Sequence, residues 1–565
     1  MSFPTASLPS TLLFGHISEH LTVGERINIS HERAKAIAAC YSLTLDDVLR
    51  PSQRFWDMYR DYIVTLDGAA VALFSIQLNL AAGTLAPFIE SRPELKTLMD
   101  DILSFRISAQ FLLTELGHGL NALHLETTAT MQNDGSFIVD TPNPQAAKYM
   151  APTLPFGGVP RVGILMARLM VRGEDRGIRP FIVSLNDGKT MCTGVTAREL
   201  PSRLGCKSFG HALTYFDHVK IPSSALLGTI ANTADARSQF IETIWRVAIG
   251  SMSMSAMVSP ALKMASYIAA TYSKRRLVVG PRNQTIPILS FRTQQLPILH
   301  ALAQGYVLDA LYQQAITWLS EISVEDINQR NAIATIVKAT MIGHWRRTGC
   351  SIADRCGAQG MFECNQILPM EMELRGVAIA EGDVLALALR LAPELLLKRY
   401  TIPAGQKRDS LLNQHEQKLG EEMSAIIAAS QQRHRGDDVN RLLLPRCLQF
   451  VDAIGHRMAW EAAITQGLPE PLIRLYEISA VGTDLAWYVE KRLFSRDDFF
   501  RQEDEALSTV YSHLQEYLDA MDIAPYAVAA ITSDSSWKKF SDSLKVYEGN
   551  ADYAPFSETI ARARL

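Results

Sequence analysis

Apolar side chains recur at helical spacing over three long parts of the chain. The 3.6-residue period in RFWDMYRDYIVTL and in PELKTLMDDILSFRISAQFLL predicts helices over residues 15–112. Apolar-periodic segments return over residues 235–400, including IETIWRVAIGSMSMSAMVSPALKMASYIAATYSKRR, with lengths typical of a helical bundle. A polar segment at 401–440 marks a boundary, and a further helical block is expected over residues 441–565.

The pattern changes over residues 114–228. Short β-rich runs, LETTATM, SFIVDT, RVGILMARLMV and RPFIVSL, are separated by turn sequences such as Asn133-Asp134-Gly135. These runs predict an antiparallel β domain between helices. The expected fold class is therefore α+β, with an N-terminal helical domain (1–113), a β-sandwich or barrel domain (114–230), a helical bundle (231–400) and a C-terminal helical domain (401–565).

Composition excludes several classes of partner. The 55 Lys and Arg against 59 Asp and Glu give a net charge of −4, so no global basic field favours nucleic acid. The seven cysteines form no CxxC pair, which predicts reduced intracellular thiols and no metal site. The apolar window Ala69–Phe88 contains Gln77, Asn79 and Gly83, which suits a buried core helix better than a membrane span.

The two ends of the chain bear on localisation. The N-terminus has no basic region before a long apolar run, so a secretory signal is not expected. The last residues, Ala563-Arg564-Leu565, match the small-basic-leucine pattern of a C-terminal peroxisomal address, and also fit an ordinary basic helix end. The expected location is peroxisomal, otherwise cytoplasmic.

The first candidate ligand-binding segment is TELGHG, residues 114–119, followed by LETTAT. Gly117 and Gly119 would let backbone amides approach a ligand closely, and the Thr114 hydroxyl could hydrogen-bond a planar heterocycle. The same residues also fit a simple turn.

The second candidate is YSKRRLVVG, residues 272–280, where a basic cluster ends a long predicted helix. Positive charge is favourable at the negative end of the helix dipole. An arginine in this place is also suited to a phosphate or pyrophosphate. Composition does not choose between the two.

The third candidate is CGAQGM, residues 356–361. Gly357 and Gly360 each cost a helix about 1 kcal/mol relative to alanine. Close packing or backbone approach to a ligand would explain them, and so would a helix C-cap.

The fourth candidate is AIAEGDVLAL, residues 378–387, in which Glu381 is flanked by apolar residues. An ionised carboxylate in an apolar cavity is disfavoured unless paired, and desolvation raises its proton affinity. A general base for a weakly acidic C–H bond needs that property. Alternatively, Gly382 and Asp383 cap the next helix, with Glu381 merely beside its positive end.

These four segments, in this order, resemble the acyl-CoA oxidase branch of the acyl-CoA dehydrogenase superfamily. GIRPFIVSL, the pair Leu204-Gly205 and YFDHVKIP are also similar to that family, as is the spacing of Tyr272, Arg276, Gly280 and Phe291. The resemblance extends over residues 60–400, and the C-terminal block fits the extra helical domain of the oxidases.

The resemblance implies a homodimeric enzyme that binds FAD. The cofactor-binding residues it implies are Thr114, Gly117, Gly119, Arg276, Gln294, Gln295, Gly357, Gly360 and Asp383. The first three would lie against the flavin, Arg276 would contact the pyrophosphate of FAD, and Asp383 would lie near FAD. Either Gln294 or Gln295, together with Gly357 and Gly360, would contact the ADP portion from a neighbouring subunit.

The resemblance also implies the reaction, that of an FAD-dependent acyl-CoA oxidase or dehydrogenase of EC class 1.3. Glu381 would take the α-proton of an acyl-CoA thioester while the β-hydrogen leaves as hydride to the flavin, giving the 2,3-enoyl thioester. Hydrogen bonds from the Glu381 backbone and the flavin ribose would stabilise the enolate-like charge. Molecular oxygen would reoxidise the flavin and give hydrogen peroxide.

The chain departs from the family pattern at two places near the expected substrate. Lys148-Tyr149-Met150-Ala151-Pro152-Thr153 replaces a Trp-Trp-Pro-Gly-Gly run, and Ala380 replaces the aromatic residue before the catalytic glutamate. Tyr149, Met150, Ala380 and Gly382 are therefore the expected substrate-contacting residues. The changes favour a specialised substrate, such as a polyketide or branched acyl thioester.

Two alternatives stay open from the sequence. The altered YMAPT segment is compatible with a catalytically silent partner subunit or acyl-thioester binder. A dehydrogenase with a protein electron acceptor, or an enzyme acting on carrier-protein thioesters, would use the same residues. These residues do not determine oxygen reactivity, and the oxidase-type C-terminal block and the Ala-Arg-Leu ending favour the oxidase by analogy.

Overall fold

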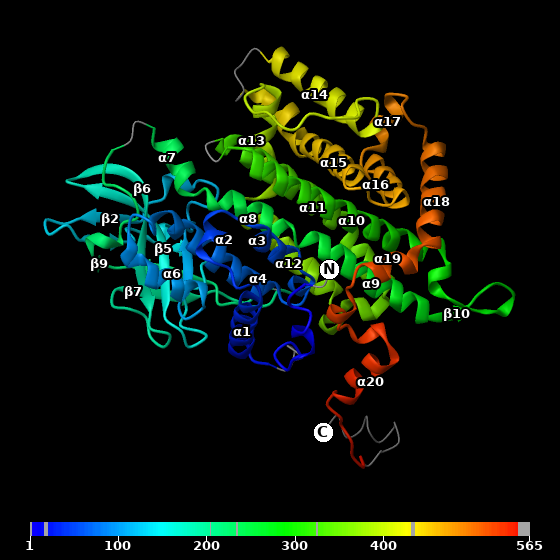
Figure 1. Ribbon diagram of the computed structural model, residues 1–565, viewed down its shortest axis with the longest axis horizontal. Coiled ribbons are helices and arrows are strands. Elements are labelled where there is room, and N and C mark those ends of the chain that lie inside the picture. Colours follow the sequence, from blue (N-terminus) through cyan, green and yellow to red (C-terminus); the bar gives the residue numbers. More distant parts are fainter. Residues whose placement is uncertain are drawn as a thin grey trace, which may run out of the picture.

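A computed structural model describes residues 3–15, 21–203, 205–232, 235–323, 326–430 and 436–551. In Figure 1 a β domain lies at one side of a long helical body, and the C-terminal helices cover that body from above and from the opposite side. The predicted α+β class and the order of its parts are confirmed.

The N-terminal part is helical, as expected, and its first four α-helices begin at polar caps. Thr22 forms a capping box with Glu25 at the start of the first helix. The helices are α1 Val23–Tyr41, α2 Leu45–Leu49, α3 Gln53–Arg60, α4 Gly68–Phe74, the π-helical segment Ser75–Ala82, α5 Gly83–Leu85 and α6 Lys96–Leu103.

One continuous helical stretch within the described ranges, Gly68–Phe88, is long and apolar enough to cross a membrane. However, 89% of its apolar window is buried inside the protein, as in a core helix.

The prediction of a helix up to residue 112 is wrong at its end. The helix α6 stops at Leu103, Phe105 adopts the left-handed φ of 57°, and Ser108–Leu112 forms strand β1. This strand pairs in parallel with Arg161–Leu165, so the β domain starts before TELGHG. The apolar positions in FRISAQFLL fit both the helical and the strand period. Pairing with a strand distant in sequence decides that this segment is a strand.

The β domain is confirmed, but its pairing is mixed rather than wholly antiparallel. The larger sheet has the order β1-β5-β2-β3-β9 with β6 also on β5, and both β1 and β2 run parallel to β5. A second sheet has the order β4-β8-β7. The strands are β2 Thr128–Met131, β3 Phe137–Asp140, β4 Lys148–Tyr149, β5 Arg161–Val171, β6 Glu174–Asn186, β7 Val195–Glu199, β8 Ala212–Phe216 and β9 Val219–Ile221.

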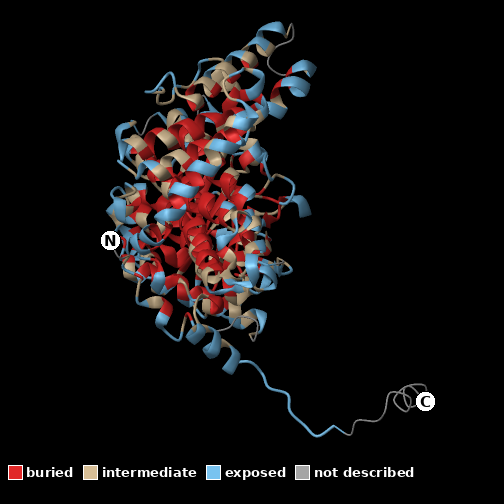
Figure 2. Cartoon of the chain, turned by 90° about the vertical axis from the view of Figure 1, so that its right-hand side faces the viewer, coloured by how far each residue is buried: buried red, intermediate tan, exposed pale blue. Residues whose placement is uncertain are grey.

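A helical bundle follows the β domain. Its long helices α9, α10 and α11 pack on one another, and the buried residues concentrate along the centre of the body in Figure 2. The elements are α7 Ala236–Thr243, α8 Arg246–Ser255, α9 Val258–Arg275, β10 Leu277–Val279, β11 Thr285–Pro287, α10 Arg292–Glu321, α11 Ile327–Arg355, α12 Ile367–Ile379 and α13 Val384–Leu396.

The C-terminal block is helical, as predicted, and packs on the bundle. Helix α15 contacts α10, α11 and α13, which makes the block a cover over the bundle. Its helices are α14 Leu411–Ala429, α15 Cys447–Thr465, α16 Glu470–Gly482, α17 Leu485–Glu490, α18 Arg496–Ser512, α19 Leu514–Ala520 and α20 Asp534–Asp542. The terminal tripeptide Ala563-Arg564-Leu565 lies outside the described residues.

Candidate active site

Glu381 lies on a tight turn between α12 and α13. Both Glu381 (φ 54°) and Gly382 (φ 102°) adopt left-handed backbone conformations, which glycine tolerates and glutamate does not favour. Asp383 is the N-cap of α13, because its carboxylate accepts a hydrogen bond from the Ala386 amide at 3.0 Å. The helix-cap interpretation is therefore right for Asp383, and it leaves Glu381 on a strained backbone, as functional residues often are.

The Glu381 side chain enters a space that only a glycine leaves open. A Cβ atom built on Gly250 of α8 would lie 1.1 Å from Oε2 of Glu381. The amide nitrogen of Asn79, on the π-helical segment, lies 3.5 Å from the same oxygen. Gly250 was not predicted as a site residue from the sequence. The available signal was a glycine inside a predicted helix, where it lowers helix stability relative to alanine.

Burial raises the pKa of the Glu381 carboxyl from its ordinary value of 4.5 to about 8. The positive charges of Lys338 and Arg246 act in the opposite direction. Arg246 is itself fully buried; it donates to the carbonyls of Asn79 and Val48 at 2.9 Å each, and its second terminal nitrogen has no partner in the described part of the chain. Glu381 thus has the proton affinity that a base near neutral pH needs.

An apolar cavity of about 110 Å³ adjoins Glu381 and Gly382. It shares Trp245, Ala248, Asn331 and Ala334 with a second cavity of about 350 Å³. The other lining residues come from α7, α8, α11, α13 and the segments that follow α7 and α13, and they are Ile241, Ile244, Val247, Ser251, Ala332, Thr335, Leu387, Arg390, Leu391 and Tyr400. This arrangement places a carboxyl of raised pKa at the wall of a space suited to an acyl chain.

The predicted substrate residues are only partly brought together. Gly382 lines the cavity beside Glu381, whereas Ala380 is exposed and Tyr149 and Met150 lie on and just after β4 in the β domain. The Tyr149 amide donates to the Thr114 carbonyl at 2.9 Å, so the YMAPT segment lies beside TELGHG.

A buried ion pair fixes the TELGHG segment. Lys148 Nζ lies 3.0 Å from Glu115 Oε1, both side chains are fully buried, and Glu115 also accepts from the amides of Glu126 and Thr127. Burial lowers the pKa of Lys148 to about 8, while the ammonium holds the pKa of Glu115 below its ordinary value. Gly119 has open space where a side chain would be, and Gly117 packs against Gln145.

The basic cluster at the end of α9 separates into different roles. Arg275 donates to the Ile531 carbonyl and pairs with Asp534, and Lys274 donates to Gln515, so both tie α9 to the C-terminal block. The Arg276 side chain, by contrast, is exposed and forms no hydrogen bond or ion pair with the residues the structure describes, whereas its backbone amide donates to the Tyr272 carbonyl.

The predicted contacts to the ADP portion gather near Arg276. The Gln294 side-chain nitrogen donates to the Arg355 carbonyl (2.7 Å) and to Ser273 (2.8 Å), which joins the ends of α9, α10 and α11. Gln295 is buried and donates to the Leu289 carbonyl at 2.9 Å, so its amide is occupied within the chain.

Glycine occurs at the two positions of CGAQGM for different structural reasons. Gly357 has a left-handed φ of 57° directly after α11 and open space around it, which fits a C-cap that leaves the backbone accessible. A Cβ on Gly360 would lie 2.1 Å from the Ala353 carbonyl oxygen, so close packing requires this glycine.

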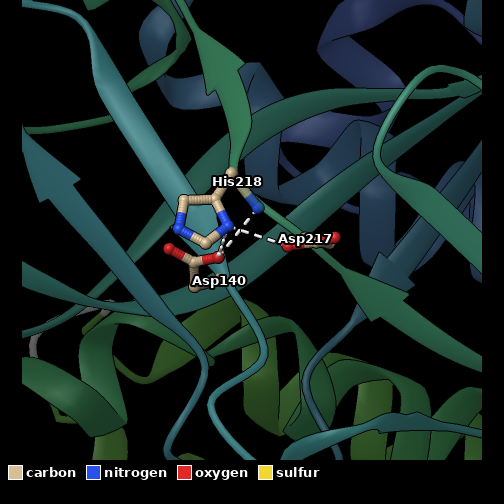
Figure 3. Close-up of side chains that lie close together, drawn as sticks. All are labelled: Asp140, Asp217 and His218. Carbon is tan, nitrogen blue, oxygen red and sulfur yellow. Dashed lines mark hydrogen bonds and ion pairs between the residues drawn. The ribbon is translucent and has the colours of Figure 1, made fainter.

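A separate group of possible metal ligands lies on the surface of the β domain. Figure 3 shows the His218 ring beside Asp140 and Asp217, with Nδ1 2.8 Å from Asp217 and 3.4 Å from Asp140. The two aspartates raise the pKa of His218. His218 and Asp217 are exposed, and the group shares no residue with the cavity beside Glu381.

The chain combines a helical domain, a β domain and a helical bundle with Glu381 on a turn near its end, and this architecture is that of solved acyl-CoA oxidases. Comparison with known proteins confirms the resemblance to acyl-CoA oxidases in sequence and in fold. No family model matches the chain.

The sequence relatives include human peroxisomal acyl-coenzyme A oxidase 3, 29% identical over 38% of this chain and 32% of that protein. Acyl-coenzyme A oxidase acox-1.3 of Caenorhabditis elegans is 25% identical over 74% of this chain and 65% of its own length. The matches thus span less than two thirds of the length of these curated relatives.

Among solved structures, acyl-CoA oxidase-2 of C. elegans, bound with FAD, ascaroside-CoA and ATP, has a similar fold. The TM-score is 0.71 at 16% sequence identity, with 96% of each chain covered. The extra C-terminal helical block is therefore part of the shared fold.

Proposed function

We propose that the protein is an FAD-dependent acyl-CoA oxidase that converts an acyl-CoA thioester to its 2,3-enoyl thioester and reduces oxygen to hydrogen peroxide. The observation that carries this proposal is the Glu381 carboxyl, whose pKa burial raises to about 8 beside an apolar cavity. The relatives named above support the same activity.

In this reaction Glu381 removes the proton from the α-carbon, and that C–H electron pair becomes the new double bond as the β-hydrogen departs with its own pair. When bound, FAD would accept the departing β-hydride and transfer two electrons to oxygen. The Glu381 amide donates no hydrogen bond to any described acceptor, so it is available to the thioester oxygen. The apolar cavity would hold the acyl chain and exclude water, which strengthens these interactions.

The residues present fit FAD at two separate places. TELGHG offers open backbone at Gly119, and the region of Arg276 offers an unpaired guanidinium and the accessible turn at Gly357. In Figure 1 the β domain and the β10 hairpin next to Arg276 lie at opposite ends of the molecule. One chain therefore does not bring both places to one cofactor, and we infer that two copies form each site.

Exposed apolar side chains support an interface between copies at the Arg276 end. They are Leu277 (51% exposed), Val279 (70%), Phe291 (42%), Met361 (74%) and Phe362 (55%). Apolar residues this exposed mark interaction surfaces when they gather in one region.

Replacing Arg276 with alanine is expected to weaken flavin binding by about tenfold to a hundredfold, because a charge-assisted contact contributes about 1.5–3 kcal/mol. The flavin retained per protein after gel filtration measures the effect. Arg275→Ala is the matched control, since that side chain is committed to Ile531 and Asp534. Equal flavin loss from both variants would contradict the assignment of Arg276.

Replacing Trp245 with alanine is expected to join the two cavities, because this side chain lines both. The variant should gain at least about tenfold in kcat/KM for longer or branched acyl-CoAs relative to short ones, the discrimination that one or two methylene groups provide. A panel of chain lengths measures the ratio. An unchanged chain-length profile would place the acyl chain elsewhere.

The proposed activity is tested by adding a panel of acyl thioesters, including CoA and carrier-protein forms, to the purified protein without oxygen. Bleaching of the flavin spectrum, followed by recovery and peroxide formation in air, is the expected result. A protein that takes up no FAD would refute the proposal. Bound flavin without turnover of any thioester would favour a catalytically silent partner subunit, for which the Tyr149-Met150 departure is the motivating observation.

We infer a peroxisomal location. The peroxisomal naming of relatives supports it.

A further inference from the structure

The turn that carries Glu381 presents three consecutive carbonyl groups to side chains of neighbouring helices. Lys338 Nζ, from α11, lies 2.5 Å from the Ala380 oxygen and 2.6 Å from the Gly382 oxygen. The Ser251 hydroxyl, from α8, donates to the carbonyl of Glu381 itself. Every peptide carbonyl from 380 to 382 is therefore held from outside the turn.

Lys338 is an unusual residue for this place. Its side chain is fully buried, and no described carboxylate lies within ion-pair distance of its ammonium. Burying an ammonium without such a partner is costly, so its two short charge-assisted bonds must offset much of that cost. Both bonds are made to peptide groups that directly flank Glu381.

The bonds also act where the backbone is least favourable. Glu381 and Gly382 hold consecutive left-handed conformations, and that region is unfavourable for a residue other than glycine. A turn without external bonds would relax and redirect the Glu381 side chain. The Glu381 carboxylate occupies the space that a side chain at Gly250 would fill.

We propose that Lys338 is a positioning residue for the catalytic base: its ammonium, together with the Ser251 hydroxyl, clamps the turn and fixes the direction of the Glu381 carboxylate. This inference rests on the proposed function of Glu381. The clamp gives Lys338 a role that is separate from proton transfer.

The same ammonium acts on the charge of Glu381. Burial raises the pKa of Glu381 and lowers that of Lys338 to about 8, while each charge favours the other. The other charged or titratable groups that act on this pair are Tyr59 of α3, Arg246 of α8, Arg346 of α11 itself, and Asp383 beside the turn. Removing the Lys338 charge therefore moves the pKa of Glu381 further upward.

The test compares flavin-loaded Lys338→Met and Ser251→Ala with wild type. Lys338→Met should lower kcat by about a hundredfold with KM within about threefold, the cost of a misplaced catalytic group. It should also shift the ascending limb of the pH profile upward by about one unit or more. Ser251→Ala should lower kcat about tenfold without moving that limb, because the hydroxyl carries no charge.

The matched control is Lys263→Met. Lys263 is also a buried lysine, but it pairs with Asp309 at 3.0 Å and lines a different cavity. Its loss should leave the pH limb unchanged. A folded Lys338→Met protein with kcat and pH limb like wild type would overturn the proposal; if this variant does not fold, an unchanged kcat in Ser251→Ala would overturn it.

An infrared titration separates this inference from the proposed function. The carboxyl band of Glu381, isolated as wild type minus Glu381→Gln, gives its protonation midpoint without turnover. A higher midpoint in Lys338→Met supports the electrostatic part of the clamp even if no thioester reacts. If Lys338→Met has the same midpoint and the same thioester-binding affinity as wild type, the proposed role of Lys338 is refuted.

Discussion

A Glu381→Gln variant is expected to reduce flavin bleaching by acyl thioesters by about 10³-fold, because it lacks the base that removes the α-proton. Glutamine has nearly the same shape, so thioester affinity should change by less than about threefold. Anaerobic stopped-flow measurement separates the two quantities. An active Glu381→Gln enzyme would remove Glu381 from the mechanism.

The same variant has a signature in pH dependence. In wild type the base works as the carboxylate, so flavin reduction should rise with pH up to about 8, the pKa that burial gives Glu381. The folded pKa lies above the ordinary 4.5, so stability associated with the protonated carboxyl is present below about 4.5 and is lost as pH rises towards 8. In thermal melts, the Tm of Glu381→Gln should therefore increase relative to that of wild type as the pH rises from 5 to 8.

Glu373→Gln is the matched control for this experiment. Glu373 is another carboxyl on α12 whose pKa burial raises, to about 7, and its carboxylate accepts from the Lys207 amide at 2.8 Å. It does not line the cavity beside Glu381. Its replacement should change pH-dependent stability while leaving flavin reduction within about threefold of wild type.

A Gly250→Ala variant is expected to fold and to lose about a hundredfold in kcat. Alanine in place of a helical glycine stabilises a helix by about 1 kcal/mol where there is room. Here the new methyl group would occupy the position of Glu381 Oε2, so the carboxylate must turn away from the reacting carbon. Steady-state kinetics and a thermal melt measure both effects.

The control and a double-mutant cycle sharpen this test. Gly24→Ala, in α1, adds a methyl group into open space and should leave kcat unchanged. Glu381→Asp shortens the base, so combining it with Gly250→Ala should cost less than the product of the two single losses. Fully additive losses, or a Gly250→Ala enzyme with normal kcat, would show that the two side chains do not meet during catalysis.

Much of this arrangement could be predicted because it is local in sequence. Asp383 as a helix cap and the end of α9 before Arg276 follow from residues within one or two turns. The four motifs in their order then gave the resemblance, which the comparisons confirm. The residues implied as FAD contacts stay predictions, although the structure gathers all of them except Asp383, the N-cap of α13, into two groups.

The parts that sequence did not predict depend on distant partners. Ser108–Leu112 was assigned to a helix because its strand character is decided by pairing with β5. Gly250 and Lys338 meet Glu381 from α8 and α11, and in isolation they look like a helix-weakening glycine and an ordinary helical lysine. Side chains that converge from separate helices leave no fixed spacing to recognise.

The separation of TELGHG from Arg276 across the molecule has a consequence for how the protein behaves at low concentration. On the proposed dimer, dilution that separates the copies also divides each cofactor site in half. Association of subunits and retention of flavin then become linked equilibria, and each strengthens the other. Excess FAD would therefore promote association of the two subunits as well as fill the cofactor sites.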